Sequence, residues 1–381
     1  MSFRGIRVLI DGRPIRLPIS GVGQYVCSLA GELAVLSDIE MRLMTLEFGR
    51  CLPLTEFKLP LNCLRHVSRV PRKLFNIAAE HLNLPLANLI CGQVDLVHHT
   101  FFGWLPAAKG TAVVSTIHDV IPIEQPEKFT RTNAFYSGRN FWRQIRNSQA
   151  IIAVSEYTKS KIIEVGRIND DRNIVVIPNG VRNLSALVTA ETMPGLRERW
   201  GIDRPYVLYV GNIESRKGVA TLLRAFRRLS VAKDLQLVIA GRKCWGYEEV
   251  EALASECPAG QVVFPGYITE QEKASLLTDA HVFVYPSTYE GFGIPILEAM
   301  HCGCPVISAD NSSLTELCRG AGELFTTESV GDLTEKLNML LGSAQRRQTL
   351  IAAGRARAKL FTWERAAVDT ARLYRSVVGR I

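Results

Sequence analysis

Residues 286–300 read Pro286-Ser-Thr-Tyr-Glu290-Gly-Phe-Gly293-Ile-Pro295-Ile-Leu-Glu298-Ala-Met300, and they follow the apolar run His281-Val-Phe-Val-Tyr285. A short run rich in β-branched and aromatic residues is typical of a buried strand. Proline is well tolerated at the first helical position, so we expect a helix from about Pro295 to Met300 or His301. The stretch therefore predicts a strand, a loop that contains glycine, and a helix.

The loop and the start of the helix carry two carboxylates, Glu290 and Glu298. Gly291 and Gly293 between them let backbone amides approach a ligand closely, and the helix N-terminus adds a partial positive charge. The carboxylates can accept hydrogen bonds from hydroxyl groups while the amides donate others, which suits a sugar together with a ribose. The spacing alone fits an ordinary turn with solvated glutamates equally well.

The residue types favour the first interpretation, because the stretch resembles the Glu-x7-Glu signature of the retaining, GT-B-fold glycosyltransferases of family 4. The family pattern continues into Gly-x-Pro-Val, and here the continuation is Gly303-Cys304-Pro305-Val306. Cys304 departs from the family, which usually has Thr or another small residue there, and this affects local packing rather than chemistry. The resemblance runs from Gly21-Val-Gly23 to Phe361-Thr-Trp363 and is strongest over 262–316.

Length and composition fit an intracellular globular protein. The chain has 381 residues, more than one hydrophobic core usually supports, so two domains are expected. No apolar run approaches the roughly 20 residues that cross a bilayer, and the start lacks the features of a signal peptide. We therefore expect a cytoplasmic protein.

The nine cysteines are scattered, without a Cys-x-x-Cys pair. Reduced and mostly buried thiols fit this pattern better than disulfides or zinc. Cys302 and Cys304 form the one close pair, and we expect both at packing positions.

The net charge of +8 favours an anionic partner without identifying it. Two segments, 57–79 and 128–155, carry five cations each and no acid. Nucleic acid, anionic lipid headgroups and nucleotide phosphates would all be attracted, and solvated helix faces explain the segments equally well.

Apolar strands alternate with helical patterns in both halves of the chain. Strands are expected at 6–10, 94–97, 112–117, 150–154, 174–177, 206–210, 235–239, 261–264, 282–285 and 305–308, and helices at 133–147, 156–165, 219–230, 247–256, 270–278, 330–341, 344–360 and 363–378. This alternation predicts an α/β fold with two doubly wound parallel sheets, which bind ligands at the carboxyl ends of their strands. Residues 183–204 are predicted to be a polar connection.

The resemblance implies the GT-B arrangement, in which two Rossmann-like domains face a central cleft that holds the active site. We predict an acceptor-side domain over 1–182 and a nucleotide-sugar domain over 183–362. The helix within 363–381 would pack back on the first domain, as it does in the family.

Ser20-Gly21-Val-Gly23-Gln-Tyr25 follows the first strand and opens a helix, which places the glycine turn where it can cradle a phosphate. The third glycine of the dinucleotide fingerprint is missing, so NAD binding is not predicted. The resemblance implies that the loop with Gly21 and Gly23 reaches toward the donor diphosphate.

His118 follows the strand 112–117. A single histidine in this position is more often structural, but the resemblance places His118 beside the donor sugar. Asp119 can act as a general base or cap the following loop.

The loop that contains Arg216-Lys217-Gly218 follows the first strand of the second half. Two adjacent cations in such a loop can clamp a diphosphate, although the pattern is also common on surfaces. The family's Arg-Lys-Gly loop gives Arg216 and Lys217 the role of stabilising the departing nucleoside diphosphate. Arg242-Lys243 is a similar pair with a weaker signal.

The resemblance assigns the other donor contacts. Gly266 and Tyr267 would lie near the nucleotide base, which is held largely through backbone groups. Glu298 would bind the ribose hydroxyls, and Glu290 would hold the transferred sugar with the amides of Phe292 and Gly293.

The mechanism implied is front-face displacement with retention, in which the leaving phosphate helps to take the acceptor proton. A double displacement with Glu290 as nucleophile is the alternative. The one acidic motif of note as a metal site is Asn169-Asp170-Asp171, and it is predicted to lie in a polar loop. We therefore expect no metal or other cofactor.

We therefore interpret the sequence as a hexosyltransferase of the mannosyltransferase type, with GDP-mannose as the expected donor. The acceptor would be a lipid-linked oligosaccharide of O-antigen or surface polysaccharide synthesis, met at the inner face of the plasma membrane, where the basic segments can dock. The alternatives are a GT-B-fold epimerase or phosphorylase, and a catalytically silent component of a polysaccharide assembly complex.

Overall fold

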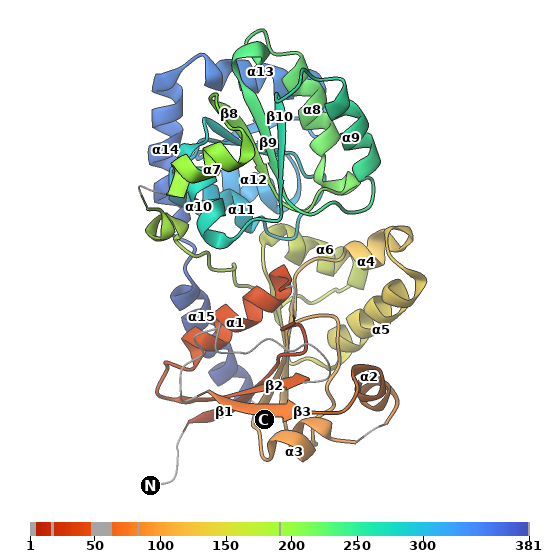
Figure 1. The fold of residues 1–381 in the computed structure, drawn as a ribbon. Helices are drawn as coiled ribbons and strands as arrows, with labels where there is room; N and C mark the ends of the chain where they lie inside the picture. The colour runs from red at the N-terminus through yellow and green to blue at the C-terminus, as the bar shows by residue number, and fades with distance from the viewer. Residues whose placement is uncertain (1–4, 17–18, 47–62, 83, 190–191, 380–381) are drawn as a thin grey trace. The chain divides into compact units, whose positions relative to one another are not determined.

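The computed structural model describes residues 5–16, 19–46, 63–82, 84–189 and 192–379 (Figure 1). The chain divides into two compact units: unit 1 comprises Met1–Gly180 and Thr362–Ile381, and unit 2 comprises Val181–Phe361. Each unit contains one parallel β-sheet with helices on both faces. This confirms the α/β fold class with two doubly wound sheets.

Unit 1 has a seven-stranded sheet in the order β3-β2-β1-β4-β5-β6-β7. Its strands are β1 (Ile6–Asp11), β2 (Ile39–Leu46), β3 (Leu64–Ser68), β4 (Leu96–His99), β5 (Ala112–Ile117), β6 (Ala150–Ala153) and β7 (Ile174–Val176). The sequence does not predict a strand at β2 or β3. Both depart from the continuous apolar run of a central strand, because β2 alternates apolar residues with Glu40 and Arg42, and β3 is a largely exposed edge strand.

The helices of unit 1 cover both faces of this sheet (Figure 1). One face carries α1 (Gly21–Leu33) and α15 (Trp363–Val378), and the other carries α2 (Arg72–His81), α3 (Leu86–Cys91), α5 (Arg131–Asn147) and α6 (Glu156–Gly166), with the short α4 (Ile121–Glu124) before α5. Consecutive residues of a strand point to opposite faces, so each strand contributes to both cores.

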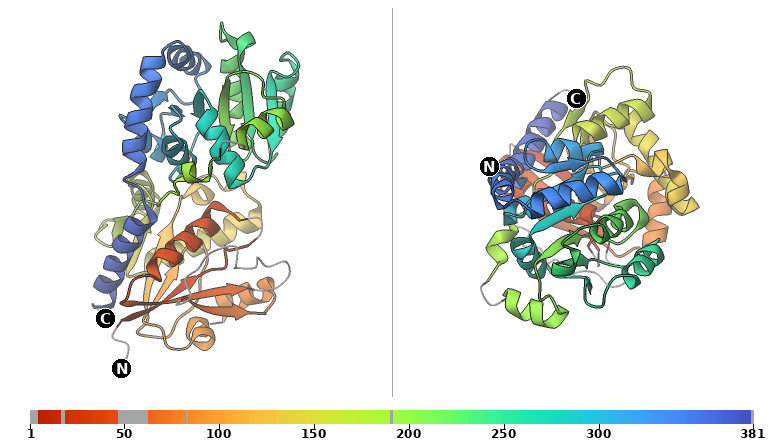
Figure 2. Two further views of the ribbon diagram at one scale, coloured as in Figure 1. Left: turned by 60° about the vertical axis from the view of Figure 1, so that its left-hand side comes forward. Right: turned by 90° about the horizontal axis from the view of Figure 1, so that it is seen from above.

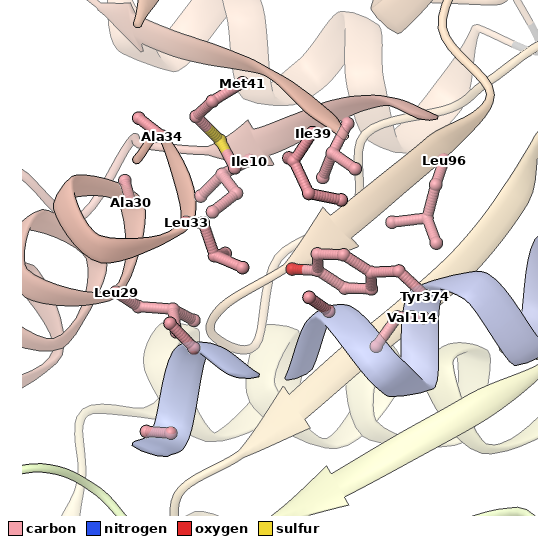
Figure 3. Close-up of a cluster of buried hydrophobic side chains, with 14 of the residues drawn as sticks. Ile10, Leu29, Ala30, Leu33, Ala34, Ile39, Met41, Leu96, Val114 and Tyr374 are labelled. Atoms are coloured by element: carbon pink, nitrogen blue, oxygen red, sulfur yellow. The ribbon is translucent and has the colours of Figure 1, made fainter. Parts of the chain in front are cut away.

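Helix α15 packs on the sheet and on α1, although it is the last element of the chain. Its buried residues recur every three or four positions from Trp363 to Val377, and the Thr362 side chain caps its first turn. Figure 3 shows Tyr374 of α15 among apolar side chains of α1 and of the strands. An ion pair between Arg375 and Asp38, at 2.6 Å, lies at the surface of this contact.

A chain of buried hydrogen bonds also holds α15 to the sheet. His98 Nδ1 lies 2.7 Å from the Tyr374 hydroxyl, and His98 Nε2 lies 2.7 Å from Thr116 Oγ1. Thr116 in turn contacts the hydroxyl of Tyr25, in α1, at 3.0 Å. Elements distant in sequence are therefore joined through polar groups that water does not reach.

Buried histidines should make unit 1 less stable in acid. Burial lowers the pKa of His98 to about 3 and that of His99 to about 4, from an ordinary value of 6.5. Between the lowered pKa of each histidine and 6.5, the unfolded chain binds a proton that the folded chain excludes. The free energy of unfolding therefore rises with pH over this range and levels off above 6.5. Each histidine contributes at most about 1.4 kcal/mol per pH unit.

We therefore expect the melting temperature to fall steadily as the pH is lowered from 7 toward 5. His99→Gln should show a shallower fall, because it removes one of the titrating groups. An identical slope in the wild type and in this variant would contradict the expectation.

Unit 2 has a six-stranded sheet in the order β10-β9-β8-β11-β12-β13. The strands are β8 (Tyr206–Val210), β9 (Gln236–Ala240), β10 (Val262–Gly266), β11 (Val282–Tyr285), β12 (Val306–Ala309) and β13 (Glu323–Phe325), and the helices are α7 (Thr192–Trp200), α8 (Val219–Arg227), α9 (Tyr247–Ser255), α10 (Glu270–Asp279), α11 (Ile294–Cys302), α12 (Ser312–Cys318), α13 (Val330–Leu341) and α14 (Ala344–Ala358). Helices α8, α9 and α13 pack together, as do α7, α10, α11 and α14 (Figure 2).

Several details of the prediction for this half are wrong. Helix α11 begins at Ile294, so Pro295 is its second residue, because Gly293 with a φ of 111° forms the N-cap. The predicted polar connection over 183–204 contains helix α7, which the high polarity of Thr192–Trp200 concealed. Strand β13 and helix α12 were also missed.

The cysteines that the structure describes are free thiols, and Cys302 and Cys304 are buried, as expected for packing positions. Cys51 and part of the basic segment 57–79, including Lys58, lie outside the described residues. None of the described helices combines the length and the apolar character that a bilayer crossing requires.

Candidate active site

The predicted donor residues of unit 2 lie at the carboxyl edge of its sheet, where the strand order changes direction. Chain order runs from β8 outward to β10 on one side and from β11 outward to β13 on the other. Ligands of open α/β sheets bind at such a switch point. The loop after β8 carries Arg216 and Lys217, and the loop after β11 carries Glu290.

These two loops are in direct contact. The Thr288 amide donates a hydrogen bond to the carbonyl oxygen of Arg216 at 2.9 Å. Gly218 has a φ of 66°, and a Cβ atom there would lie 2.1 Å from the carbonyl oxygen of Pro286. Glycine at this position therefore permits the approach that brings Lys217 to the β11 loop.

Glu290 is the centre of a cluster of donors. Its Oε1 accepts hydrogen bonds from Lys217 Nζ, from Ser287 Oγ at 2.7 Å and from the Tyr285 hydroxyl at 3.1 Å. Arg216 Nη1 lies 3.4 Å from the same oxygen. The structure thus brings together three predicted catalytic residues, Glu290, Arg216 and Lys217.

The charges of the cluster keep Glu290 ionised. Burial by itself raises the pKa of this carboxyl, but the positive charges of Lys217 and Arg216 outweigh burial, and the pKa is lowered overall. All four contacts involve Oε1, and no donor among the described residues contacts Oε2. A carboxylate with one open oxygen can accept a hydrogen bond from a sugar hydroxyl.

Two serines of α12 fix the loop from Glu290 to Gly293. Ser313 Oγ lies 2.9 Å from the carbonyl oxygen of Glu290 and 2.7 Å from that of Phe292. The Glu290 amide donates to Ser312 Oγ at 3.1 Å. In the part of the chain that the structure describes, the amides of Phe292 and Gly293 have no partner, so they remain available to donate to a ligand.

Glu298 lies on α11 and forms an ion pair with Lys273 of α10 at 2.8 Å. Lys273 also pairs with Glu270 at 2.9 Å. Burial raises the pKa of Glu298, and the charge of Lys273 opposes this rise. Lys273 cannot be identified from the sequence, because its pairing with Glu298 depends on how α10 packs against α11.

Replacing Glu298 with alanine should mainly weaken nucleotide binding. Losing the hydrogen bonds of a carboxylate to ribose costs about 1.5–3 kcal/mol, or ten- to hundredfold in affinity. Glu270→Ala is the matched control, because it removes a carboxylate from the same lysine and leaves Glu298 in place. Calorimetry showing equal losses in both variants would contradict a ribose contact by Glu298.

Gly266 and Tyr267 lie at the end of β10, at the same edge of the sheet. Gly266 has a φ of 77°, and its carbonyl oxygen accepts a hydrogen bond from the Gly241 amide at 2.8 Å. The Tyr267 side chain is 65% exposed, and the Arg242 guanidinium lies 4.5 Å from the centre of its ring. No hydrogen bond among the described residues joins these side chains to the cluster around Glu290.

In unit 1, Gly21 and Gly23 form the first turn of α1. The Gly23 amide donates to the N-cap side chain of Ser20 at 3.1 Å. A Cβ atom on Gly23 would lie 2.9 Å from the carbonyl oxygen of Pro14, so this glycine also permits close packing. The Gly21 amide has no partner among the described residues, and it is the one better placed to meet an anion at the helix N-terminus.

His118 follows β5 and is held in one orientation. Its Nε2 lies 3.0 Å from the carbonyl oxygen of Thr100, which can only accept, so Nε2 carries the hydrogen. The Tyr25 ring stands edge-on to the imidazole at 4.7 Å. Burial lowers the pKa of His118 to about 4, so the ring is neutral and Nδ1 is a hydrogen-bond acceptor. The Asp119 side chain accepts from the Ile121 amide at 3.1 Å, which fits the capping role.

The acidic motif of residues 169–171 forms ordinary surface pairs. Asp170 pairs with Arg172, and Asp171 pairs with Lys159 at 2.8 Å. Among the described residues, no three His, Cys, Asp or Glu side chains are grouped so that they could hold a metal ion.

Solved structures with the same architecture define the fold. The Anabaena HepE protein in complex with UDP and glucose is similar to this chain, with a TM-score of 0.72 and 19% identity. The similarity covers 97% of this chain and 100% of the HepE chain. Sucrose-phosphate synthase from Thermosynechococcus elongatus is similar over 99% of this chain and all of its own, with a TM-score of 0.75 and 21% identity. The fold is that of the GT-B glycosyltransferases.

Sequence comparisons give the family. The profile described as "Glycosyltransferase Family 4" matches residues 19–182, and that described as "Glycosyl transferases group 1" matches residues 195–357. The two matches cover both units, and the chain belongs to the group 1 glycosyltransferases of family 4.

Two curated relatives extend the comparison. O-antigen chain mannosyltransferase B of Escherichia coli is 28% identical over 97% of this chain and 100% of its own length. An MMP α-(1→4)-mannosyltransferase of Mycolicibacterium hassiacum is 34% identical over 43% of this chain and 41% of its own length.

Proposed function

We propose that the protein transfers a mannosyl group from GDP-mannose, with retention of configuration, onto a lipid-linked oligosaccharide of O-antigen or another surface polysaccharide. The observation that carries this proposal is the similarity to O-antigen chain mannosyltransferase B, which spans nearly all of both chains. The cluster of cations and carboxylate at the switch point of unit 2 supports a sugar nucleotide as the donor.

In the proposed reaction, Arg216 and Lys217 bind the donor diphosphate. As the glycosidic bond breaks, negative charge grows on the leaving phosphate, and fixed cations stabilise it more in the transition state than in the ground state. Lys217 is 12% exposed, so little water screens its charge. Glu290 Oε2 and the amides of Phe292 and Gly293 would then hold the sugar.

The donors around Glu290 favour positioning over nucleophilic attack. A carboxylate oxygen that accepts from an ammonium group and two hydroxyls is a weaker nucleophile, because those donors stabilise its charge in the ground state. His118, neutral and with Nδ1 as an acceptor, is suited to orient a sugar hydroxyl. It is not suited to act as a cationic acid at neutral pH.

We also propose that no metal is required, since two cations serve the diphosphate. The test is calorimetry and thermal shift with GDP-mannose, GDP-fucose, UDP-glucose, UDP-N-acetylglucosamine and dTDP-rhamnose, with EDTA present throughout. Selective stabilisation by GDP-mannose is expected. Stabilisation by another sugar nucleotide would overturn the donor, and a requirement for a divalent ion would overturn metal independence.

The membrane contact belongs to the same proposal, and a surface of unit 1 supports it. Leu74 and Ile77, one turn apart on α2, are 58% and 52% exposed. Arg65 and Arg69, just before α2, are also exposed. An apolar stripe beside cations is the composition that binds anionic lipid surfaces.

Replacing Arg65 and Arg69 by Gln, together with Leu74 and Ile77 by Ser, should reduce binding to vesicles that contain anionic lipid by at least about tenfold. The control is Arg224→Gln with Arg227→Gln, which removes the same charge from unit 2. Equal vesicle binding by the two variants in a sedimentation assay would contradict this membrane surface.

A further inference from the structure

Tyr285, the last residue of β11, connects Lys217 to Glu290 through its hydroxyl group. The hydroxyl oxygen accepts a hydrogen bond from Lys217 Nζ at 3.2 Å, and the hydroxyl donates one to Glu290 Oε1 at 3.1 Å. Burial and the charge of Glu290 raise the pKa of the Tyr285 phenol well above its ordinary value of 10.0, so the hydroxyl keeps its proton. The directions of the two hydrogen bonds are fixed, because an ammonium group can only donate and an ionised carboxylate can only accept.

The ring of Tyr285 is held by two aromatic neighbours. It lies nearly parallel to the rings of Tyr209 and Phe283, with interplanar angles of 14° and 20° and centroid distances of 6.3 and 6.0 Å. Tyr209 and Phe283 are fully buried strand residues, and Tyr285 itself is 2% exposed. The hydroxyl therefore has a fixed position, and little conformational freedom remains to be lost when it binds a partner.

The Lys217 side chain needs such a fixed partner, because a lysine carries its charge at the end of a flexible four-carbon stem. Two of the three hydrogens of its ammonium group are accepted by Glu290 and Tyr285. These acceptors differ in charge. Glu290 is an anion, so a bound diphosphate competes with it for the ammonium group, whereas the neutral Tyr285 hydroxyl can keep its hydrogen bond when the diphosphate binds.

We propose that Tyr285 is a positioning residue that holds the Lys217 ammonium group against the leaving phosphate during transfer. The proposal rests on the proposed function in taking Lys217 as a ligand of the donor diphosphate, and it does not depend on which sugar or base the donor carries. Misplacing a group of the site by about 1 Å can cost about a hundredfold in rate. Without the hydroxyl, the ammonium group can follow Glu290 away from the phosphate, and it then stabilises the growing charge less well.

The first test is a double-mutant cycle of turnover in the full chain. Tyr285→Phe keeps the ring and its stacking and removes only the hydroxyl. We expect this variant to lower kcat about tenfold and to change the KM for the donor by less than about threefold, because the contact matters most where charge grows. In a Lys217→Ala background, Tyr285→Phe should change kcat by less than about twofold, because the group that it positions is gone.

Two variants serve as controls. Ser287→Ala removes another donor from Glu290 Oε1, at 2.7 Å, and no hydrogen bond among the described residues joins Ser287 to Lys217. Its cycle with Lys217→Ala measures the coupling that passes through Glu290, and we expect it to be smaller than the coupling of Tyr285. Tyr206→Phe removes a different buried hydroxyl, which donates to the Leu276 carbonyl oxygen at 2.7 Å, and should leave turnover unchanged.

The second test needs no turnover. In a crystal structure of the full chain with inorganic pyrophosphate, Lys217 Nζ should lie within hydrogen-bond distance of both the Tyr285 hydroxyl and a phosphate oxygen. An ammonium group that leaves the hydroxyl when it meets the phosphate would overturn the positioning role. Unchanged kcat in Tyr285→Phe, or equal coupling in the Tyr285 and Ser287 cycles, would also overturn it.

Failure of the proposed donor would give a different result. Turnover of another sugar nucleotide in place of GDP-mannose, with the larger coupling still found for Tyr285, would contradict the proposed donor and support the positioning role. Turnover of GDP-mannose that Tyr285→Phe does not slow would support the donor and contradict the positioning role.

Discussion

Replacing Lys217 with alanine is expected to lower the turnover number by a factor on the order of a hundred or more, because a fixed charge that stabilises a developing oxyanion contributes several kcal/mol. The variant should still fold. Glu290 keeps Ser287 at 2.7 Å, Tyr285 at 3.1 Å and Arg216 at 3.4 Å as neighbours, so its charge is not left alone. The measurement is the initial rate of nucleoside diphosphate release at saturating donor and acceptor.

Lys243→Ala is the matched control for this experiment. Lys243 lies in the neighbouring loop, is exposed and pairs with Glu251, so its loss should change turnover by less than about twofold. Lys217→Arg should retain part of the activity, because the charge remains while its position changes. Near-normal turnover of Lys217→Ala would show that Lys217 does not stabilise the leaving diphosphate.

The second large effect is expected for Glu290→Gln, which should lower turnover at least about a hundredfold while GDP binds as tightly as before or more tightly. The substitution removes the acceptor for the sugar. It also leaves Lys217 and part of the Arg216 charge without their anionic partner, and the phosphates of GDP can take its place. Turnover and GDP affinity should therefore separate.

Glu290→Ala with added azide distinguishes positioning from nucleophilic catalysis. If Glu290 attacked the sugar, azide could enter the vacated space and form a glycosyl azide. We expect no such product, because the four donors to Oε1 stabilise the negative charge of the whole carboxylate in the ground state and so make it a weaker nucleophile. A glycosyl azide would contradict the positioning role, and loss of GDP binding in Glu290→Gln would contradict the charge argument.

The central strands of both sheets could be predicted because they are continuous apolar runs. Strand β5, buried at all its positions, was predicted with its observed bounds, as was β11. Edge and half-buried elements could not be recognised in the same way. Strand β3 is mostly exposed and α7 is polar, so their structure depends on neighbours distant in sequence.

The residues of the candidate site also differ in how far the sequence predicts their positions. Residues within one motif, such as Glu290 and Gly293, could be assigned from the sequence, because a strand, a loop and a helix determine where they lie. The groups that support them come from other elements. Ser313 reaches the Glu290 loop from α12, and Lys273 reaches Glu298 from α10. Such contacts depend on how the helices pack against one another, and no local sequence pattern predicts that packing.

The transfer reaction itself tests the central claim most directly. The full chain would be incubated with GDP-mannose and a lipid-linked oligosaccharide in the presence of EDTA, and the GDP released and the acceptor extended would both be counted. We expect equal amounts of the two products, a mannosyl linkage with the anomeric configuration of the donor by NMR, and almost no GDP when the acceptor is omitted. GDP release without extension of the acceptor, or an inverted linkage, would contradict the account.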